Sequence, residues 1–85
     1  MKAQKNQAKK VEEIISALTE LLEDTTVPKN IKTRVENAIN ALKEDDVSIG
    51  VDKALQELDE AADDVNIQPY TRTQIWGIVS MLEKI

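Results

Sequence analysis

Apolar side chains recur along this chain at the spacing of one helix face, and they do so in four separate segments. The segments cover residues 11–22, 31–42, 51–62 and 75–85. Apolar residues at i, i+3, i+4 and i+7 predict amphipathic α-helices, and no segment has the alternation that predicts a strand. Connections of a few residues place successive helices antiparallel. We therefore predict one all-α domain, an up-and-down four-helix bundle over residues 1–85, with helices at about 4–24, 28–43, 47–63 and 69–84.

A second regularity appears when the sequence is shifted by about 40 residues, a period typical of HEAT-type helical pairs. All six apolar positions of residues 11–22 then fall on apolar positions of residues 51–62, and Lys32-Thr33 falls on Arg72-Thr73. This registry favours an αα-hairpin used twice. The alternative is that any two helices of similar length align their apolar stripes. Two hairpins are too few for a solenoid, so we expect them to close into a bundle.

The predicted helix at residues 47–63 has the smallest core side chains. Its apolar stripe includes Ala54, Ala61 and Ala62 where the first helix has Ile and Leu. Gly50 costs about 1 kcal/mol relative to Ala in a helix, which indicates crowding at that point. We expect this helix to lie close to its neighbours, with Asp46 as its N-cap.

The chain has no Cys and no His, which removes most catalytic and metal-binding chemistry. Disulfides, Cys/His zinc sites and His-activated nucleophiles are excluded. Its two glycines form no phosphate-binding loop, and the carboxylates lack the spacing of a calcium-binding loop. We expect a solvated acidic face, with no catalytic, cofactor-binding or metal-binding residues, and so no enzyme.

The formal charge of −5 is unevenly distributed, because residues 43–64 hold nine acidic residues against two Lys. An acidic body disfavours broad binding of a phosphate backbone. Helices 2 and 4 of the predicted bundle are parallel, so Lys29, Lys32, Tyr70 and Arg72 gather at one end. Helix N-termini with cations can bind anions, which is the basis of an alternative hypothesis, an accessory nucleic-acid or RNP-binding protein. The favoured interpretation is that these cations balance the acidic body.

The predicted fourth helix has a wider apolar arc than a surface helix needs. Trp76 and Met81 lie outside its core stripe. This width predicts either burial on two sides within the bundle or contact with a second subunit. We expect a non-catalytic protein-interaction or scaffold module, homodimeric through this helix. The candidate interface residues are Arg72, Trp76, Val79 and Met81, and the Arg72 guanidinium is placed to cover the Trp76 ring four residues later.

The start of the fourth helix has two interpretations. Thr71 and Gln74 fit a T-x-x-Q capping box, with Tyr70 and Ile75 as its hydrophobic staple. Pro69 offers a competing start one turn earlier. Both alternatives stay open at the level of sequence.

The segment MKAQKNQAKK lacks the apolar region of a signal peptide. No apolar run approaches the roughly 20 residues that span a bilayer. We therefore expect no membrane association and a cytoplasmic protein.

Two stretches carry a family resemblance. DTTVPKNIKTRVENAINAL and, after an acidic linker, PYTRTQIW resemble a small archaeal family catalogued as uncharacterised protein family number one-four-seven. The resemblance covers nearly the whole chain and is strongest at Asp24–Asn30 and Pro69–Trp76. It implies a four-helix bundle from an archaeal cytosol, and it implies no activity.

Overall fold

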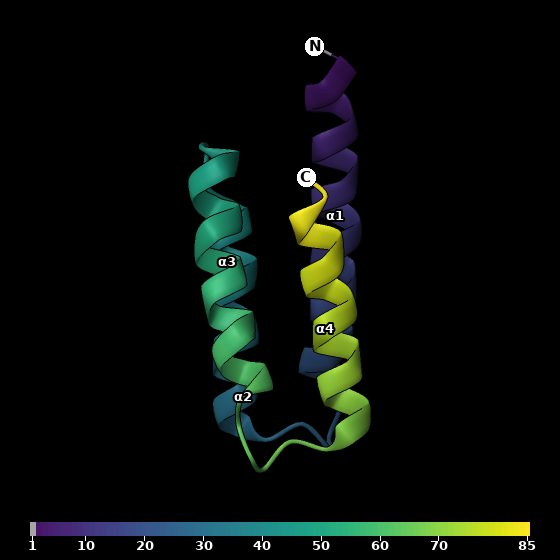
Figure 1. Ribbon diagram of the computed structural model, residues 1–85, viewed down its shortest axis with the longest axis vertical. Helices are drawn as coiled ribbons and strands as arrows, with labels where there is room; N and C mark the ends of the chain where they lie inside the picture. The colour runs from purple at the N-terminus through teal and green to yellow at the C-terminus, as the bar shows by residue number, and fades with distance from the viewer. Residues whose placement is uncertain (1) are drawn as a thin grey trace.

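The computed structural model describes the backbone of residues 2–85 and the side chains of residues 9–85. The four helices are α1 (Lys2–Glu23), α2 (Lys29–Leu42), α3 (Val47–Ala62) and α4 (Pro69–Glu83). They run alternately up and down, and residues 2–85 contain no strand (Figure 1). The predicted all-α four-helix bundle is confirmed, and each helix end lies within two residues of its expected position.

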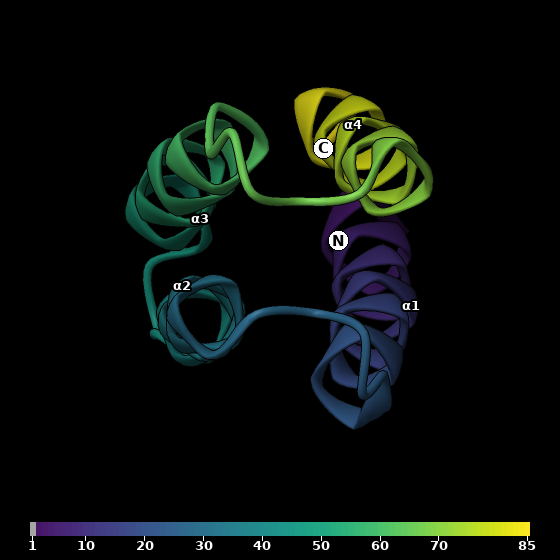
Figure 2. The ribbon, with the colours of Figure 1, turned by 90° about the horizontal axis from the view of Figure 1, so that it is seen from below.

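Seen along the bundle, the helices occupy the corners of a square in chain order, so α2 and α4 lie at opposite corners (Figure 2). The loops after α1 and α3 lie at one end of the bundle, and α1 extends past the other helices at the opposite end (Figure 1). Among neighbouring helices, α2 and α3 make the most extensive contact and α1 and α4 the least.

The helix starts show which capping residues the fold uses. Asp46 caps α3 as predicted, since its Oδ1 accepts a hydrogen bond from the Ile49 N–H at 3.2 Å. α4 begins at Pro69, with Gln68 as an N-cap whose side chain makes no cap hydrogen bond. Proline suits this first position because the N–H that it lacks would have no helical partner.

The capping-box interpretation of α4 is therefore wrong. Thr71 lies inside the first turn with its side chain buried, and neither its Oγ1 nor the Oε1 of Gln74 has a hydrogen-bond partner. The proposed hydrophobic staple is also wrong, because Tyr70 is 68% exposed. Starting the helix at Pro69 turns Thr71, not Tyr70, toward the core.

The loops of the two hairpins share their conformation. The Asp24 carboxylate accepts the Thr26 N–H at 2.8 Å, and the Asp64 carboxylate accepts the Asn66 N–H at 2.7 Å. Val27 and Ile67 then bury their side chains at the same point of each loop. These residues correspond in the shifted alignment. A common origin of the two hairpins stays a prediction.

The core is a continuous apolar cluster drawn from all four helices. Its largest fully buried apolar side chains are Ile14, Leu18, Leu21, Ile31, Leu58, Ile75, Leu82 and Val35. Toward α2, the core side chains of α3 are small, since Ala54 and Ala61 are completely buried. A Cβ at Gly50 would overlap the backbone carbonyl oxygen of Ala41 in α2. The predicted crowding at Gly50 is thus explained by direct approach of the α3 backbone to α2.

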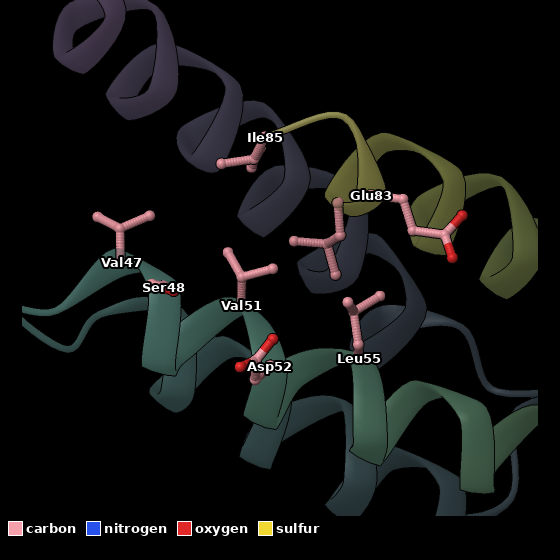
Figure 3. A pocket seen from close by; sticks show the side chains of 8 residues that line it. Val47, Ser48, Val51, Asp52, Leu55, Glu83 and Ile85 are labelled. Carbon is pink, nitrogen blue, oxygen red and sulfur yellow. The ribbon is translucent and has the colours of Figure 1, made fainter.

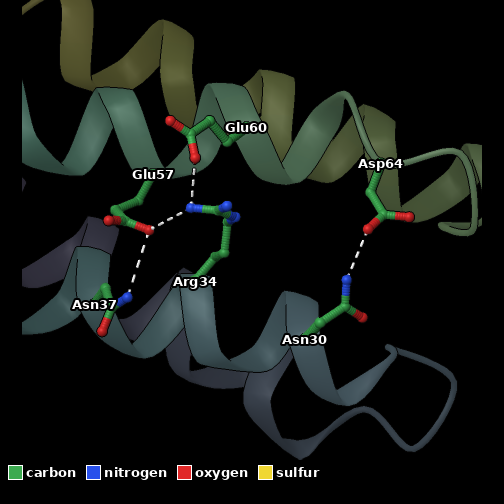
Figure 4. Close-up of polar contacts among 6 residues, drawn as sticks. All are labelled: Asn30, Arg34, Asn37, Glu57, Glu60 and Asp64. Atoms are coloured by element: carbon green, nitrogen blue, oxygen red, sulfur yellow. Dashed lines mark hydrogen bonds and ion pairs between the residues drawn. The ribbon is translucent and has the colours of Figure 1, made fainter.

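Polar pairs close the solvent side of the α2–α3 contact (Figure 4). Arg34 lies between two acids of α3, 3.1 Å from a Glu57 oxygen and 2.6 Å from a Glu60 oxygen. Nearer the loops, the Asn30 amide donates to the Asp64 carboxylate at 2.7 Å. Exposed pairs of this kind each contribute little to the stability of the fold. The small core residues therefore set the distance between the two helices.

We predict that substitution by alanine has opposite effects on stability at Gly50 and at Gly77. Gly50→Ala forces a methyl group against a carbonyl oxygen and should lower the free energy of unfolding by about 1–3 kcal/mol. Gly77→Ala places its Cβ in open space and should raise it, by up to about 1 kcal/mol, through helix propensity. Urea unfolding of both variants in dilute protein measures the two effects. Stabilisation by Gly50→Ala would contradict the described approach of α3 to α2.

Thr71 makes a second prediction about stability. Thr71→Val keeps the shape of the side chain and removes a buried hydroxyl that has no partner, so it should raise the free energy of unfolding by about 1 kcal/mol. The control is Thr73→Val, because Thr73 is exposed and its hydroxyl donates to the Pro69 carbonyl at 3.0 Å. We expect the control to change stability by less than about 0.5 kcal/mol. Equal effects of the two substitutions would argue against an unpaired Thr71 hydroxyl.

Candidate interaction surface

The outer face of α4 differs from the exposed faces of the other helices in carrying no charge along most of its length. Its exposed residues between positions 73 and 82 are Thr73, Trp76, Gly77, Ser80 and Met81. Trp76 is 44% exposed and Met81 is 38% exposed. The exposed face of α1 over residues 9–23 is instead dominated by Lys and Glu. Large exposed apolar side chains on an uncharged face are typical of contact surfaces.

Gly77 lies in the middle of this face. A Cβ built on it meets nothing within 4 Å, so the bundle itself supplies no reason for glycine. Glycine within a helix costs about 1 kcal/mol relative to Ala. Packing within the described residues therefore does not explain the glycine at position 77.

Two of the four predicted interface residues have other roles. Val79 is only 5% exposed and belongs to the core, so its inclusion in an interface was wrong. The error arose because a wide apolar arc on a sequence does not show which edge of the arc the neighbouring helices cover. Trp76 and Met81 keep the exposure that a contact requires.

Arg72 holds the end of α3. Its Nε donates to the Ala62 carbonyl at 2.9 Å, and its Nη2 donates to the Asp64 carbonyl at 3.1 Å. Ala62 is the last residue of α3, so the guanidinium satisfies a carbonyl at the negative end of the helix dipole. The Asp64 carbonyl in the following loop also accepts the Ile67 N–H at 3.5 Å. The Arg72–Trp76 stack stays a prediction.

A groove between α3 and α4 was not predicted from the sequence. It has a volume of about 460 Å³ and is lined by Val47, Ser48, Val51, Asp52, Leu55, Leu82, Glu83 and Ile85. Val47, Val51 and Leu55 point from α3 toward the last turn of α4 (Figure 3). In the sequence, Val51 and Leu55 belong to the same helical pattern as the buried Leu58. No sequence signal separates the walls of this groove from the core.

The end of the bundle that was predicted to be basic also carries acidic residues. Lys29, Lys32, Tyr70 and Arg72 lie at the end of the bundle where α2 and α4 begin (Figure 1). The same end carries the loop acids Asp24, Asp63 and Asp64.

Hydrogen bonds and a nearby cation favour the charged form of Asp24. The Thr26 hydroxyl and backbone N–H both donate to the Asp24 carboxylate and, with the nearby Lys32 charge, they lower its pKa. The cations at this end therefore face negative charges in the protein itself.

Two classes of feature are missing from the described residues. No group of three or more acidic side chains among them is arranged to hold a metal ion. None of their helices combines the length and apolar character needed to cross a bilayer.

The capping role of Arg72 can be tested against the matching residue of α2. Arg72→Met keeps the aliphatic stem but removes the Arg72 donor to the Ala62 carbonyl and one of the two donors to the Asp64 carbonyl, so it should lower the free energy of unfolding by about 1–3 kcal/mol. Lys32→Met, at the corresponding position of α2, should change it by less than about 1 kcal/mol. Thermal and urea unfolding measure both variants. Similar losses for the two would show that Arg72 acts through general charge and not through its hydrogen bonds.

Comparison with known proteins gives one consistent result. The sequence matches the Uncharacterised protein family (UPF0147) over residues 1–85. A UPF0147 protein of Pyrococcus horikoshii is 39% identical over 83 residues, which cover 94% of this chain and 89% of the relative. A UPF0147 protein of Methanocaldococcus jannaschii is 46% identical over 70 residues, which cover 80% of this chain and 75% of the relative.

A solved structure extends the comparison to three dimensions. The crystal structure of the unknown function protein MMP1188 is 49% identical in sequence and has a TM-score of 0.86 to this chain. The match covers 92% of this chain and 91% of that one. Its helical fold supports the architecture described above. On the match over its whole length, this chain belongs to the uncharacterised protein family UPF0147.

Proposed function

We propose that this protein is a non-catalytic interaction module that forms a homodimer through the outer face of α4. The observation that carries the proposal is the uncharged exposed face from Thr73 to Met81 with Gly77 at its centre. On so acidic a protein, a face without charges avoids like-charge repulsion when two copies meet.

A second copy suits this face because a two-fold dimer places the same patch on both partners. Gly77 leaves a shallow gap between the larger Trp76 and Met81 side chains of the same helix. In an antiparallel pairing of two α4 helices, a large side chain from each copy can occupy the gap of the other. Burying Trp76 would also supplement the modest core of an 85-residue chain.

The nucleic-acid alternative has weaker support. Lys29, Lys32 and the exposed Tyr70 share one end of the bundle, but Asp24, Asp63 and Asp64 lie there too. Arg72 is engaged with the carbonyls at the end of α3. A phosphate backbone would therefore meet both repulsion and attraction at this end.

A charge at position 77 provides the test of the homodimer. Gly77→Glu should leave the fold intact, because the site is open and glutamate is a good helix former. It should also prevent dimerisation, because two carboxylates would meet at the centre of the interface. Asn40→Glu, on the exposed face of α2, adds the same charge elsewhere. Sedimentation equilibrium from low to high micromolar concentration measures the association of wild type and both variants.

We expect wild type and Asn40→Glu to dimerise, with a blue shift of Trp76 emission as concentration rises, and Gly77→Glu to stay monomeric. A wild type that is monomeric throughout would overturn the homodimer, as would a dimer that tolerates Gly77→Glu. Fluorescence anisotropy of labelled RNA at low salt tests the alternative separately. Binding that Lys29→Glu and Lys32→Glu abolish would favour that function.

A further inference from the structure

We infer that the groove between α3 and α4 is a docking site for another protein, whose occupant is an amphipathic helix with an apolar face and flanking Lys or Arg. This surface is distinct from the outer face of α4 proposed for the dimer. The inference rests on the shape of the groove, on the charge of its edges, and on the contrast with the α2–α3 contact.

Five of the eight residues that line the groove are apolar, and the other three are Ser48, Asp52 and Glu83. Leu82 forms part of the floor and is 1% exposed, whereas Val47 on the wall is 39% exposed. Val51, Leu55 and Ile85 are half-buried and pack against the core. Two helices with apolar side chains between them form the kind of groove into which a third helix places its apolar residues.

The edges of the groove are acidic. Asp52 borders it on α3, Glu83 borders it on α4, and both are exposed. Asp59 lies seven residues after Asp52 on the same face of α3, and it is exposed as well. The nearby Lys53 is directed away from the groove, because its ammonium pairs with Glu44 at 2.8 Å.

The α2–α3 contact shows how ion pairs can close the edge between two helices. On that contact, Glu57 and Glu60 pair with Arg34 and so close the edge between the helices. Among residues 9–85, the side chains that the structure describes, neither Asp52 nor Glu83 has an ion pair. An apolar groove with unpaired acidic edges is complementary to a helix that carries basic residues beside its apolar face. The same acids disfavour nucleic acid and anionic lipid surfaces.

The experiment uses a short helical peptide of leucine and lysine as the probe, with the same peptide carrying glutamate for lysine as its control. Isothermal titration calorimetry measures binding of each peptide to the full chain. We expect the lysine peptide to bind and the glutamate peptide not to bind. The Gly77→Glu variant should bind as wild type does, which separates this site from the proposed dimer.

Matched variants locate the site. The double variant Asp52→Lys, Glu83→Lys should weaken binding of the lysine peptide by about tenfold or more. The control Glu12→Lys, Glu20→Lys makes the same charge change on the exposed face of α1, and we expect it to weaken binding less than about twofold. Val47→Ala, at an exposed wall position, should also weaken binding because apolar contact is lost. Equal losses in both double variants, or no binding by the wild type, would overturn the inference.

Discussion

The close approach of α3 to α2 at Gly50 is the constraint on which the rest of the bundle depends. The α3 backbone meets the Ala41 carbonyl oxygen, and even a methyl group would not fit between them. Buried alanines continue this contact along α3, and Arg34 with its two glutamates closes its edge. Packing this close fixes the distance between the α2 and α3 backbones.

On the other side of the bundle, α3 and α4 pack against each other less extensively than α2 and α3 do. α4 approaches α3 less closely than α2 does, and near its end the two helices leave an apolar groove with acidic edges. Its outer face carries Trp76, Gly77 and Met81 without a charge. Arg72 fixes where α4 starts relative to α3, because it bonds carbonyls at the end of α3. Both proposed contacts therefore use α4.

Patterns within a single helix were predictable from the sequence, and contacts between helices mostly were not. The four helices, the Asp46 cap and the crowding at Gly50 follow from local spacing and propensity. The T-x-x-Q pattern at Thr71 was misleading, because the same residues can cap a helix or lie in its first turn. Thr71 is buried without a partner only because α4 starts at Pro69 and turns it inward.

The sequence by itself determined the number, type and order of the helices, because apolar periodicity and short breaks are properties of the chain alone. It also excluded every chemistry that needs Cys or His. Only the tertiary structure decided that Arg72 caps α3, and that Val47, Val51 and Leu55 border a groove. These properties depend on how far apart neighbouring helices lie, and that distance is set by side-chain volumes from several segments acting together.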